Sequence, residues 1–352
     1  MTVSVPEPEV AALRDGAVLR WGVIGPGQIA DDFTSTLHAN SDQRVVAVGS
    51  RSADRAAAFA ARHGIGTAHA SYEALVADPA VQVVYVASPH PQHLEHALLA
   101  IAAGKHVLVE KPMTTSEADT RTLAAAAGAA GVLAMEAMWT RYLPGTTVIA
   151  RLLADGALGT VHLANVDVGW PHPLPVPGAT PDRMFDPAQG GGALLDAGVY
   201  AHWFARFATG APVTSRTTGA VSDGGVDLQS VTVTTTADGA QAVATTSISA
   251  WTPGLPTIAG STATIRYTDH FVFPASFALH HGADADHWRE PTGLQGRQGL
   301  VWQAAALARY VADGRTDSPV HGLDVSIGIA ASLDAARAAL DTTVPEQDTS
   351  AP

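Results

Sequence analysis

The chain of 352 residues contains no cysteine, and its acidic side chains outnumber its basic ones. The absence of cysteine excludes disulfides, thiolate nucleophiles and cysteine metal sites. The formal net charge is −13, and the sequence contains no run of lysine or arginine residues. Both observations argue against nucleic acid or an anionic membrane as a partner. No apolar stretch is long enough to span a bilayer, and the N-terminus has no signal-peptide pattern. We therefore expect a soluble, cytoplasmic protein.

Apolar, β-branched runs alternate with alanine-rich stretches through the first half of the chain. The expected strands are 19–24, 44–49, 81–87, 105–109 and 132–138, and the expected helices are 28–38, 53–63, 91–103 and 116–130. Continuous apolar strands separated by helices predict a parallel sheet that is covered on both faces. Only the ends, 6–9 and 341–352, are expected to be disordered.

A glycine-rich turn joins the first expected strand to the first expected helix. The segment from Gly25 to Ala30 reads G-x-G-x-x-A, in which Gly25 permits the tight turn and Gly27 lets a pyrophosphate approach the backbone. Ala30 allows close packing, and N–H groups at the helix start, including those of Gln28 and Ile29, are free for phosphates. Such a turn is often only a turn, but this strand–turn–helix context favours a dinucleotide site.

The end of the second expected strand indicates which dinucleotide binds. NAD-binding versions of this fold place a carboxylate there for the ribose hydroxyl. This chain has Ser50 and Arg51, with Arg55 one helical turn further on. A hydroxyl and two guanidinium groups suit a 2′-phosphate, so NADP is predicted, with NAD as the alternative. The competing structural interpretation is two solvated arginines at a helix start.

The apolar strand 105–109 ends in two opposite charges, Glu110 and Lys111, and Pro112 follows at once. Ligands of open α/β sheets bind outside the carboxyl ends of the strands, where Lys111 lies. Pro112 ends the strand and fixes the turn. A lone lysine after a strand is usually a surface residue, but this one follows a dinucleotide fingerprint.

Five stretches together resemble the glucose–fructose oxidoreductase/inositol dehydrogenase (Gfo/Idh/MocA) family of nicotinamide-dependent dehydrogenases. They are WGVIGPGQIA, SRSADRA, SPHPQHLEHALLAIAAGKHVLVEKPM, EAMWTRYLP and MFDPAQGGGALLDAGVY. The last two are most similar to the dimeric dihydrodiol/D-xylose dehydrogenase branch. The resemblance implies an NADP-binding Rossmann domain over 1–141, then a substrate-binding and dimerisation α/β domain with an open, mostly antiparallel sheet over 142–342, and a tail over 343–352.

The resemblance also implies roles for individual residues. Lys111 is expected to be catalytic and to precede a cis bond to Pro112. Tyr200, where many relatives have histidine, is expected to transfer the proton. Asp196 lies four residues before Tyr200, hence on the same face of a helix, and is expected to orient the lysine or a sugar hydroxyl. A phenol has a pKa of about 10, and the nearby ammonium of Lys111 would lower it.

Further contacts follow from the fingerprint and the resemblance. The expected cofactor contacts are Gly25, Gly27, Gln28, Ile29, Ser50, Arg51, Arg55, Ser88, Pro89, His93, Glu110 and Lys111. The expected substrate contacts are Lys111, Trp139, Arg141, Arg183, Asp196 and Tyr200. A structural ion pair is the alternative role for Arg183. The proline-rich segment 170–187 is expected to form a substrate wall.

Histidines after the third expected strand raise the question of a metal. His93 and His96 can share a helix face, but His90 cannot join them, and no carboxylate pair completes a ligand set. We therefore expect no metal and assign His96 to helix packing. His202 points away from the face of Tyr200 and is expected to pack or to support that face indirectly.

The pattern changes in the second half of the chain. Residues 230–236, 243–249 and 263–267 alternate between apolar and polar, as antiparallel strands do, and 301–311 and 323–340 are expected to be helices. An exposed apolar sheet face would be costly, so we expect a homodimer or tetramer that forms through this sheet.

The predicted activity is hydride transfer between NADP and a sugar or cyclic diol, the sugar being an aldose such as D-xylose or glucose. Tyr200 and Lys111 are the expected acid–base pair, with the cofactor carrying out the redox step. A keto-sugar reductase or inositol-type dehydrogenase of the same fold is one alternative. The other is a non-catalytic NADP-sensing regulator, which Lys111, Asp196 and Tyr200 argue against and a cleft blocked by 171–187 would favour.

Overall fold

The computed structural model describes residues 5–173 and 182–341, in two compact units. The first unit comprises Met1–Asp155, Phe271–Phe277 and His287–Ile327, and the second Gly156–His270, Ala278–Asp286 and Gly328–Pro352. The expected tail 343–352 and part of the expected substrate wall, 174–181, lie outside the described residues. Among the described helices, none has the length and apolarity needed to cross a bilayer.

The first unit begins as alternating strands and helices and ends with helices from late in the sequence. Its early elements are β1 (Arg20–Ile24), α1 (Gln28–Asn40), β2 (Arg44–Gly49), α2 (Ala53–His63), β3 (Thr67–His69), α3 (Tyr72–Ala77), β4 (Val83–Val86), η1 (His90–Gln92), α4 (His93–Ala102), β5 (His106–Val109), α5 (Glu117–Ala130), β6 (Ala134–Glu136), η2 (Trp139–Tyr142) and α6 (Pro144–Ala154). Its late elements are η6 (Gly296–Leu300) and α8 (Val301–Ala312), and α9 (Leu323–Asp341) starts in it.

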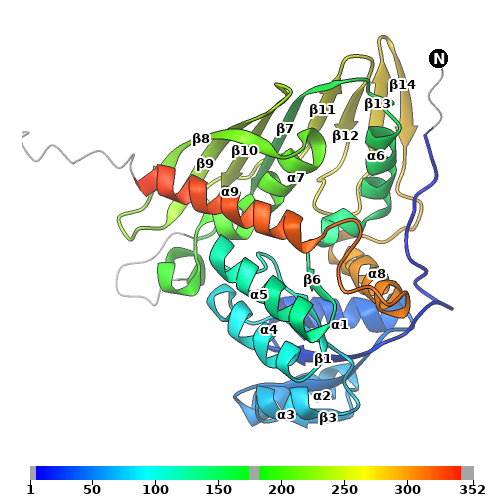
Figure 1. Ribbon diagram of the computed structural model, residues 1–352, viewed down its shortest axis with the longest axis vertical. Coiled ribbons are helices and arrows are strands. Elements are labelled where there is room, and N and C mark those ends of the chain that lie inside the picture. Colours follow the sequence, from blue (N-terminus) through cyan, green and yellow to red (C-terminus); the bar gives the residue numbers. More distant parts are fainter. Residues whose placement is uncertain (1–4, 174–181, 342–352) are drawn as a thin grey trace, which may run out of the picture. The chain divides into compact units, whose positions relative to one another are not determined.

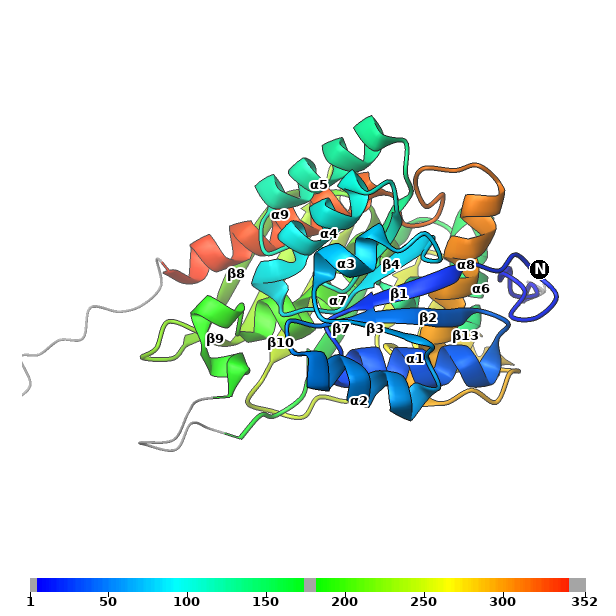
Figure 2. The same cartoon turned by 90° about the horizontal axis from the view of Figure 1, so that it is seen from below.

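The first unit contains a six-stranded sheet in the order β3-β2-β1-β4-β5-β6, with every neighbouring pair parallel. Figure 2 shows α1 and α2 on one face of this sheet and α3, α4 and α5 on the other. This is the doubly wound Rossmann arrangement that the sequence predicts. The strand order reverses at β1 and β4, so the two loops that follow them diverge and leave room for a ligand.

The helices on both faces of the first sheet explain why its strands are apolar throughout. All four residues of β4 are buried, because a parallel sheet with helices on both faces exposes neither set of its side chains. The helices show the matching local signals. In α2, the side chain of Ser52 accepts a hydrogen bond from the Arg55 N–H at the start, and Gly64 ends the helix in the left-handed conformation.

The structure departs from the sequence predictions mainly at short elements. The expected strand 132–138 shrinks to β6, because its partner β5 offers only Val107 to Val109 for pairing and η2 begins at Trp139. The elements β3 and α3 went unpredicted, since each is too short to show a period. The expected disorder at 6–9 is wrong: the Glu9 N–H donates to Thr147 Oγ1 at 3.0 Å, and a guanidinium of α6 reaches the Glu7 carbonyl.

The second unit is dominated by strands. Its elements are β7 (Val161–Gly169), η3 (Arg183–Phe185), η4 (Pro187–Gln189), η5 (Leu194–Gly198), α7 (Val199–Thr209), β8 (Pro212–Val221), β9 (Asp227–Thr236), β10 (Gln241–Ser247), β11 (Thr257–Gly260), β12 (Thr264–Tyr267), most of β13 (Phe277–His281) and β14 (Asp284–Trp288), and the larger part of α9. The strands form one sheet in the order β14-β13-β12-β11-β7-β10-β9-β8.

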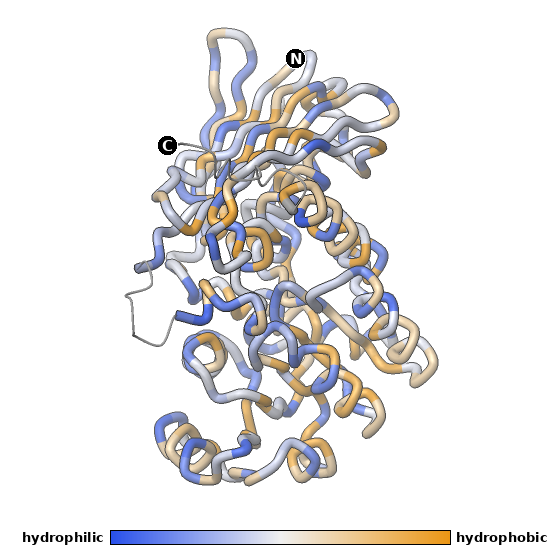
Figure 3. The backbone as a smooth tube through the Cα atoms, turned by 90° about the vertical axis from the view of Figure 1, so that its left-hand side faces the viewer, coloured by the Kyte–Doolittle hydropathy of each residue, from blue (hydrophilic) through white to orange (hydrophobic). Residues whose placement is uncertain are grey.

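This second sheet is mixed and mostly antiparallel, as predicted. The pairs β8–β9, β9–β10, β7–β11 and β11–β12 are antiparallel, whereas β7 and β10 are parallel. Figure 1 shows α7 and α9 crossing the same face of the sheet. Figure 3 shows hydrophobic and hydrophilic residues mixed along its strands, in contrast to a strand buried on both faces.

The other face of the second sheet carries exposed apolar side chains. Along β9, Thr232 and Thr234 are buried, whereas Val231 and Val233 remain 37% and 39% exposed. Leu163 on β7 is 38% exposed. Alternating burial along a strand means that one face packs on the helices and the other is open.

Candidate active site

Four loops of the first unit follow strands that are neighbours in the sheet. Because the strands are parallel, the loops after β2, β1, β4 and β5 leave the same edge in that order. Most of the predicted cofactor contacts lie on these loops: Gly25, Gly27, Ser50, Arg51, Ser88, Pro89, Glu110 and Lys111. The topology therefore gathers residues that are far apart in the sequence along one edge.

The turn after β1 fits a dinucleotide pyrophosphate. Gly25 has a φ of +84°, and a Cβ there would lie 2.8 Å from the Ala87 carbonyl oxygen, so only glycine fits. A Cβ at Gly27 would meet nothing within 4 Å, which leaves open space over the start of α1. No side chain caps this helix, so its first N–H groups are available to an anion. Gln28, at the first helical position, is exposed and donates to Asp32 at 3.2 Å.

The segment after β2 presents a hydroxyl and two guanidinium groups. Ser50 is buried, and its side chain accepts a hydrogen bond from the Ser52 N–H at 3.2 Å. Arg51 and Arg55 are exposed, and neither guanidinium forms an ion pair or hydrogen bond with any residue that the structure describes. This arrangement leaves two cations available for an anionic group.

Lys111 lies at the carboxyl end of β5, and its peptide bond to Pro112 is cis, as expected. Its N–H donates to the carboxylate of Glu110 at 3.1 Å. The other oxygen of Glu110 accepts a short hydrogen bond, 2.5 Å, from the Tyr85 hydroxyl on β4. Burial raises the pKa of Glu110, although Tyr85 and Lys111 both favour its charged form. Glu110 therefore fixes the backbone from which Lys111 projects.

A second buried carboxylate, which the sequence did not reveal, supports the other side of this turn. Glu136, at the end of β6, accepts the Met113 N–H at 2.9 Å and contacts His321 Nε2 at 3.1 Å. Burial alone would raise the pKa of Glu136, but the hydrogen bonds from His321, Ser326 and Met113 outweigh it and lower the pKa. Only the glutamate's position after a strand could have suggested this role, because His321 is far away in the sequence.

His93 and His96 anchor the loop after β4. His93 is fully buried, and its ring nitrogens lie 2.9 Å from the Pro112 carbonyl and 2.8 Å from the Ser88 carbonyl. A neutral imidazole has one N–H and donates to one of these carbonyls at a time, and burial lowers the pKa of His93. His96 packs on Tyr72 and contacts Ser88 Oγ at 2.9 Å, which confirms its packing role.

Three or more metal-binding side chains do not gather anywhere in residues 5–173 and 182–341. His90 and His93 have their rings 5.6 Å apart, but His93 is committed to the two carbonyls described above.

Trp139 and Arg141, both predicted to contact substrate, lie on η2 and face different surroundings. Trp139 is buried, with its ring 5.8 Å from that of Phe273. The guanidinium of Arg141 donates to the Val320 carbonyl at 3.1 Å and lines a pocket of about 180 Å³. Among the described residues that line this pocket, Arg141 is the only predicted site residue, and its role as a substrate contact stays a prediction.

In the second unit, a run of three glycines leads into the helix of Asp196 and Tyr200. Gly190 and Gly192 have φ of +67° and +111°, and a Cβ at Gly191 would lie 2.6 Å from the carbonyl oxygens of Arg183 and Met184. Each position therefore requires glycine. The run allows close backbone packing against η3.

The helix itself begins with a π-helical turn, η5, that continues directly into α7. Asp196 lies in the π-helical turn and Tyr200 at the start of α7, so they do not have the regular α-helical spacing that the sequence suggested. Such turns are rare and are frequently found at functional sites. Lys111 belongs to the first unit, whereas Asp196 and Tyr200 belong to the second.

Asp196 and Tyr200 each meet another residue singled out from the sequence. Asp196 pairs with Arg183 across 3.6 Å, the kind of contact that the ion-pair alternative for Arg183 predicts, and its role as a substrate contact stays a prediction. Tyr200 is 4% exposed, and its ring lies 6.4 Å from Trp170 in an edge-to-face arrangement. Trp170 stacks in turn on His270, whose pKa burial lowers. The predicted wall residue Trp170 therefore borders the tyrosine.

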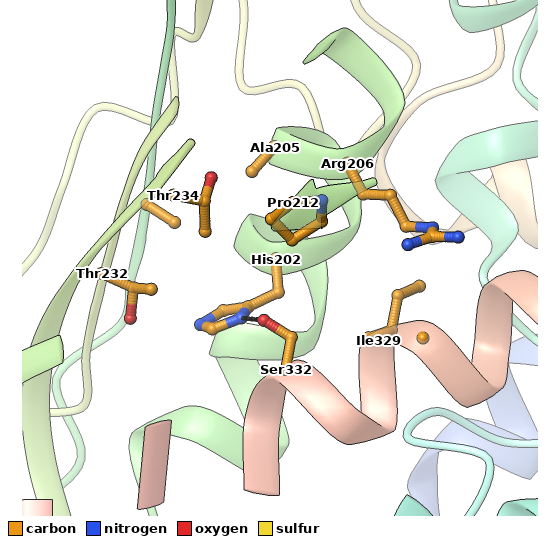
Figure 4. A pocket seen from close by; sticks show the side chains of 10 residues that line it. His202, Ala205, Arg206, Pro212, Thr232, Thr234, Ile329 and Ser332 are labelled. Atoms are coloured by element: carbon orange, nitrogen blue, oxygen red, sulfur yellow. Dashed lines mark hydrogen bonds between the residues drawn. The ribbon is translucent and has the colours of Figure 1, made fainter. Parts of the chain in front are cut away.

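His202 faces away from this cluster. It is buried, and its Nδ1 lies 2.7 Å from Ser332 Oγ on α9 (Figure 4). Thr232 and Thr234 of β9 line the same small pocket, which offers about 10 Å³, room for about one water molecule. Burial lowers the pKa of His202 to about 4, so the ring is neutral at physiological pH. The expected packing role of His202 is confirmed.

The parallel sheet and its glycine-rich turn define a class of protein, the dinucleotide-binding Rossmann proteins. Residues 19–138 match the model of an oxidoreductase family with an NAD-binding Rossmann fold, and residues 147–266 match the GFO/IDH/MocA C-terminal domain. The chain belongs to the Gfo/Idh/MocA oxidoreductase family.

Curated relatives match nearly the whole chain. A trans-1,2-dihydrobenzene-1,2-diol dehydrogenase from Homo sapiens is 32% identical over 336 residues, which cover 93% of this chain and 98% of that protein. The enzyme of the same name from Danio rerio is 36% identical over 329 residues, covering 91% and 96%.

A solved structure extends the comparison to the fold. KijD10, a 3-ketoreductase from Actinomadura kijaniata in complex with TDP-benzene and NADP, is 29% identical with a TM-score of 0.77, and the match covers 92% of this chain and 98% of that one. That structure carries a tyrosine-to-phenylalanine replacement, and a second structure of the same enzyme carries a lysine-to-alanine replacement.

Proposed function

We propose that this protein is an NADP-dependent dehydrogenase that oxidises a secondary alcohol or hemiacetal of a sugar or a cyclic diol. The observation that carries the proposal is the identity of 32–36% with dihydrodiol dehydrogenases over nearly the full length of both chains. Lys111 at the ligand-binding edge of the first sheet supports it, because a regulator that only senses NADP has no use for an ammonium there.

The chain's own residues handle the proton in this proposal. A nicotinamide, when bound, would supply the redox chemistry as acceptor of a hydride from the alcohol C–H bond. Tyr200, as phenolate, accepts the hydroxyl proton, and Lys111 stabilises both the phenolate and the oxygen on which charge develops. Asp196 orients the lysine or a substrate hydroxyl while its pairing with Arg183 limits its own movement.

The preference for NADP is part of the proposal. Arg51 and Arg55 are exposed and unengaged among the described residues, so their guanidinium groups are available to a 2′-phosphate. The buried hydroxyl of Ser50 adds a neutral hydrogen-bonding group where an NAD-binding chain would carry a carboxylate.

A keto-sugar reductase is the second candidate, and the likeness to the 3-ketoreductase at 29% identity favours it. The same Lys111 and Tyr200 would then deliver a proton to the developing alkoxide, since the two directions share one transition state. An inositol-type dehydrogenase would use the same Lys111 and Tyr200, with a cyclitol as the substrate instead of a sugar.

The open face of the second sheet supports assembly into a homodimer or tetramer. Val231, Val233 and Leu163 lie exposed on this face, and burial of such a patch stabilises association. We expect Val233→Arg to lower the molar mass found by light scattering. Val213→Arg, on the edge strand β8, is the matched control. An unchanged assembly in Val233→Arg would contradict this interface.

The direct test is reduction of NADP⁺ in the presence of D-xylose, D-glucose, inositols and a trans-dihydrodiol, with the corresponding ketones and NADPH for the reverse direction. Tyr200→Phe should abolish turnover, whereas Tyr310→Phe, on α8 of the first unit, should not. Tight NADP binding without turnover in either direction on any substrate would contradict the dehydrogenase proposal and favour a sensor.

A further inference from the structure

Asp227 begins β9, yet its side chain reaches the start of the helix that carries Asp196 and Tyr200. Its carboxylate accepts the Leu194 N–H at 2.6 Å, and the Ala193 N–H also favours its charged form. The helix has no side-chain cap of its own, because Ala193 precedes it. A residue 33 positions away in the sequence therefore supplies the cap.

The backbone around the carboxylate of Asp227 leaves space for it. A Cβ at Gly192 would lie 2.1 Å from Asp227 Oδ1, so the glycine with its φ of +111° leaves the space that the carboxylate fills. Thr246 of β10 donates to the Ala193 carbonyl at 3.2 Å, which fixes the same peptide from the other side. The first residues of the π-helical turn are thus held by two strands.

We propose that Asp227 is a positioning residue for proton transfer, which holds the π-helical turn so that Asp196 and Tyr200 keep their working orientation. The inference rests on the proposed role of Tyr200 in turnover. A wide π-helical turn is less stable than an α-helical one, so an anchor at its first N–H decides how the following residues are rotated. A carboxylate at a helix N-terminus also interacts favourably with the helix dipole.

Burial gives Asp227 a property that an ordinary cap lacks. It raises the pKa of Asp227 from 3.8 to about 6, although the N–H donors and Arg337 of α9 favour the charged form. The other charged groups nearby are paired, Arg337 with Asp334 and Asp196 with Arg183. Since the folded state binds the proton more tightly, the stabilisation from this group is complete below the ordinary pKa of 3.8 and is lost as the pH rises through about 6.

Stability and activity should therefore respond in opposite directions to this group. The charged carboxylate of Asp227 accepts hydrogen bonds from the N–H groups of Ala193 and Leu194 and so supports turnover. Burial of that charge, however, lowers the stability of the fold. We expect Asp227→Asn to lower kcat by about tenfold at neutral pH. Its melting temperature should be unchanged or higher, and KM for NADP should stay within about twofold. The acid limb of kcat near pH 6 in the wild-type enzyme should disappear.

Asp317 provides a matched control. It is also a partly buried aspartate whose pKa burial raises, and it caps a helix, with the Leu323 N–H 3.1 Å from its oxygens. That helix, α9, carries neither Asp196 nor Tyr200. Asp317→Asn should leave kcat and its pH profile unchanged. Asp227→Ala should lose more activity than Asp227→Asn, because asparagine retains one acceptor oxygen.

The inference fails if Asp227→Asn keeps the wild-type kcat and pH profile, or if its kcat falls only where its melting temperature falls. Amide hydrogen exchange of residues 194–200 gives a test that needs no turnover: protection should drop in Asp227→Ala while that of 301–312 is retained. Unchanged protection would overturn the positioning role. Wild-type turnover in Tyr200→Phe would instead refute the proposed function, so the two failures are distinguishable.

Discussion

The two parts of the proposed proton-transfer site are positioned by different means. Lys111 follows a buried strand directly, and the parallel sheet delivers it to the same edge as the glycine turn after β1. Asp196 and Tyr200 sit on a helix whose start is held by Asp227, a residue from a later strand. Strand order therefore brings the first part to its edge, where Glu110 and Glu136 support the turn, whereas a hydrogen bond from a later strand shapes the start of the second. Changes in the residues that hold the start of the helix should therefore alter the second part more than the first.

The largest effect on kcat should come from removing the proposed catalytic ammonium of Lys111 while the fold is retained. Lys111→Met should lower kcat by roughly 10³-fold, because it removes the ammonium that we propose stabilises developing charge, and it should leave the melting temperature nearly unchanged. Steady-state kinetics and calorimetry on the same preparation check both parts.

Lys105, the only other lysine of the chain, is the control for that experiment. It precedes the same strand and donates to the carbonyls of Asp78 and Val81 at 3.0 and 2.7 Å. Lys105→Met should therefore destabilise the protein by about 1–3 kcal/mol and leave kcat close to that of the wild type. The account of the sheet edge is wrong if the two lysines exchange these phenotypes.

The next largest effect is expected for a glycine of the second region, Gly192, in comparison with Gly27 of the first. Gly192→Ala should destabilise the protein by about 2–4 kcal/mol, because the new Cβ would clash with Asp227 in a backbone conformation that alanine rarely adopts. Gly27→Ala meets no protein atom, so it should leave stability unchanged and weaken cofactor binding. Chemical denaturation and a fluorescence titration with NADPH measure the two quantities. Equal loss of stability in both variants would remove the contrast.

The smallest effect should appear at Arg51. Arg51→Gln should raise KM for NADP by about tenfold, since the proposed charge-assisted contact to the 2′-phosphate would be lost, and should leave KM for NAD unchanged. Arg62→Gln, at the far end of α2 and paired with Asp31, is the control. A parallel rise of KM for both cofactors would mean that Arg51 supports the loop and does not read the 2′-phosphate.

The same contrast explains what the sequence revealed and what it concealed. The strands β2 and β4, the helix α2 and the fingerprint turn follow from local patterns, because apolar periodicity and glycine positions act within a few residues. Glu136 and Asp227 were missed because their partners, His321 and Leu194, are distant in the sequence. The π-helical turn was also missed, since no residue pattern distinguishes it from an α-helix.

The central claim is that Lys111 and Tyr200, from two different units, act as one acid–base pair. A double-mutant cycle in kcat/KM with Lys111→Met, Tyr200→Phe and the combined variant tests it most directly. If the two groups act on the same proton transfer, the combined variant should be little worse than the poorer single variant. If their effects multiply in full, the two residues act independently and the account is contradicted.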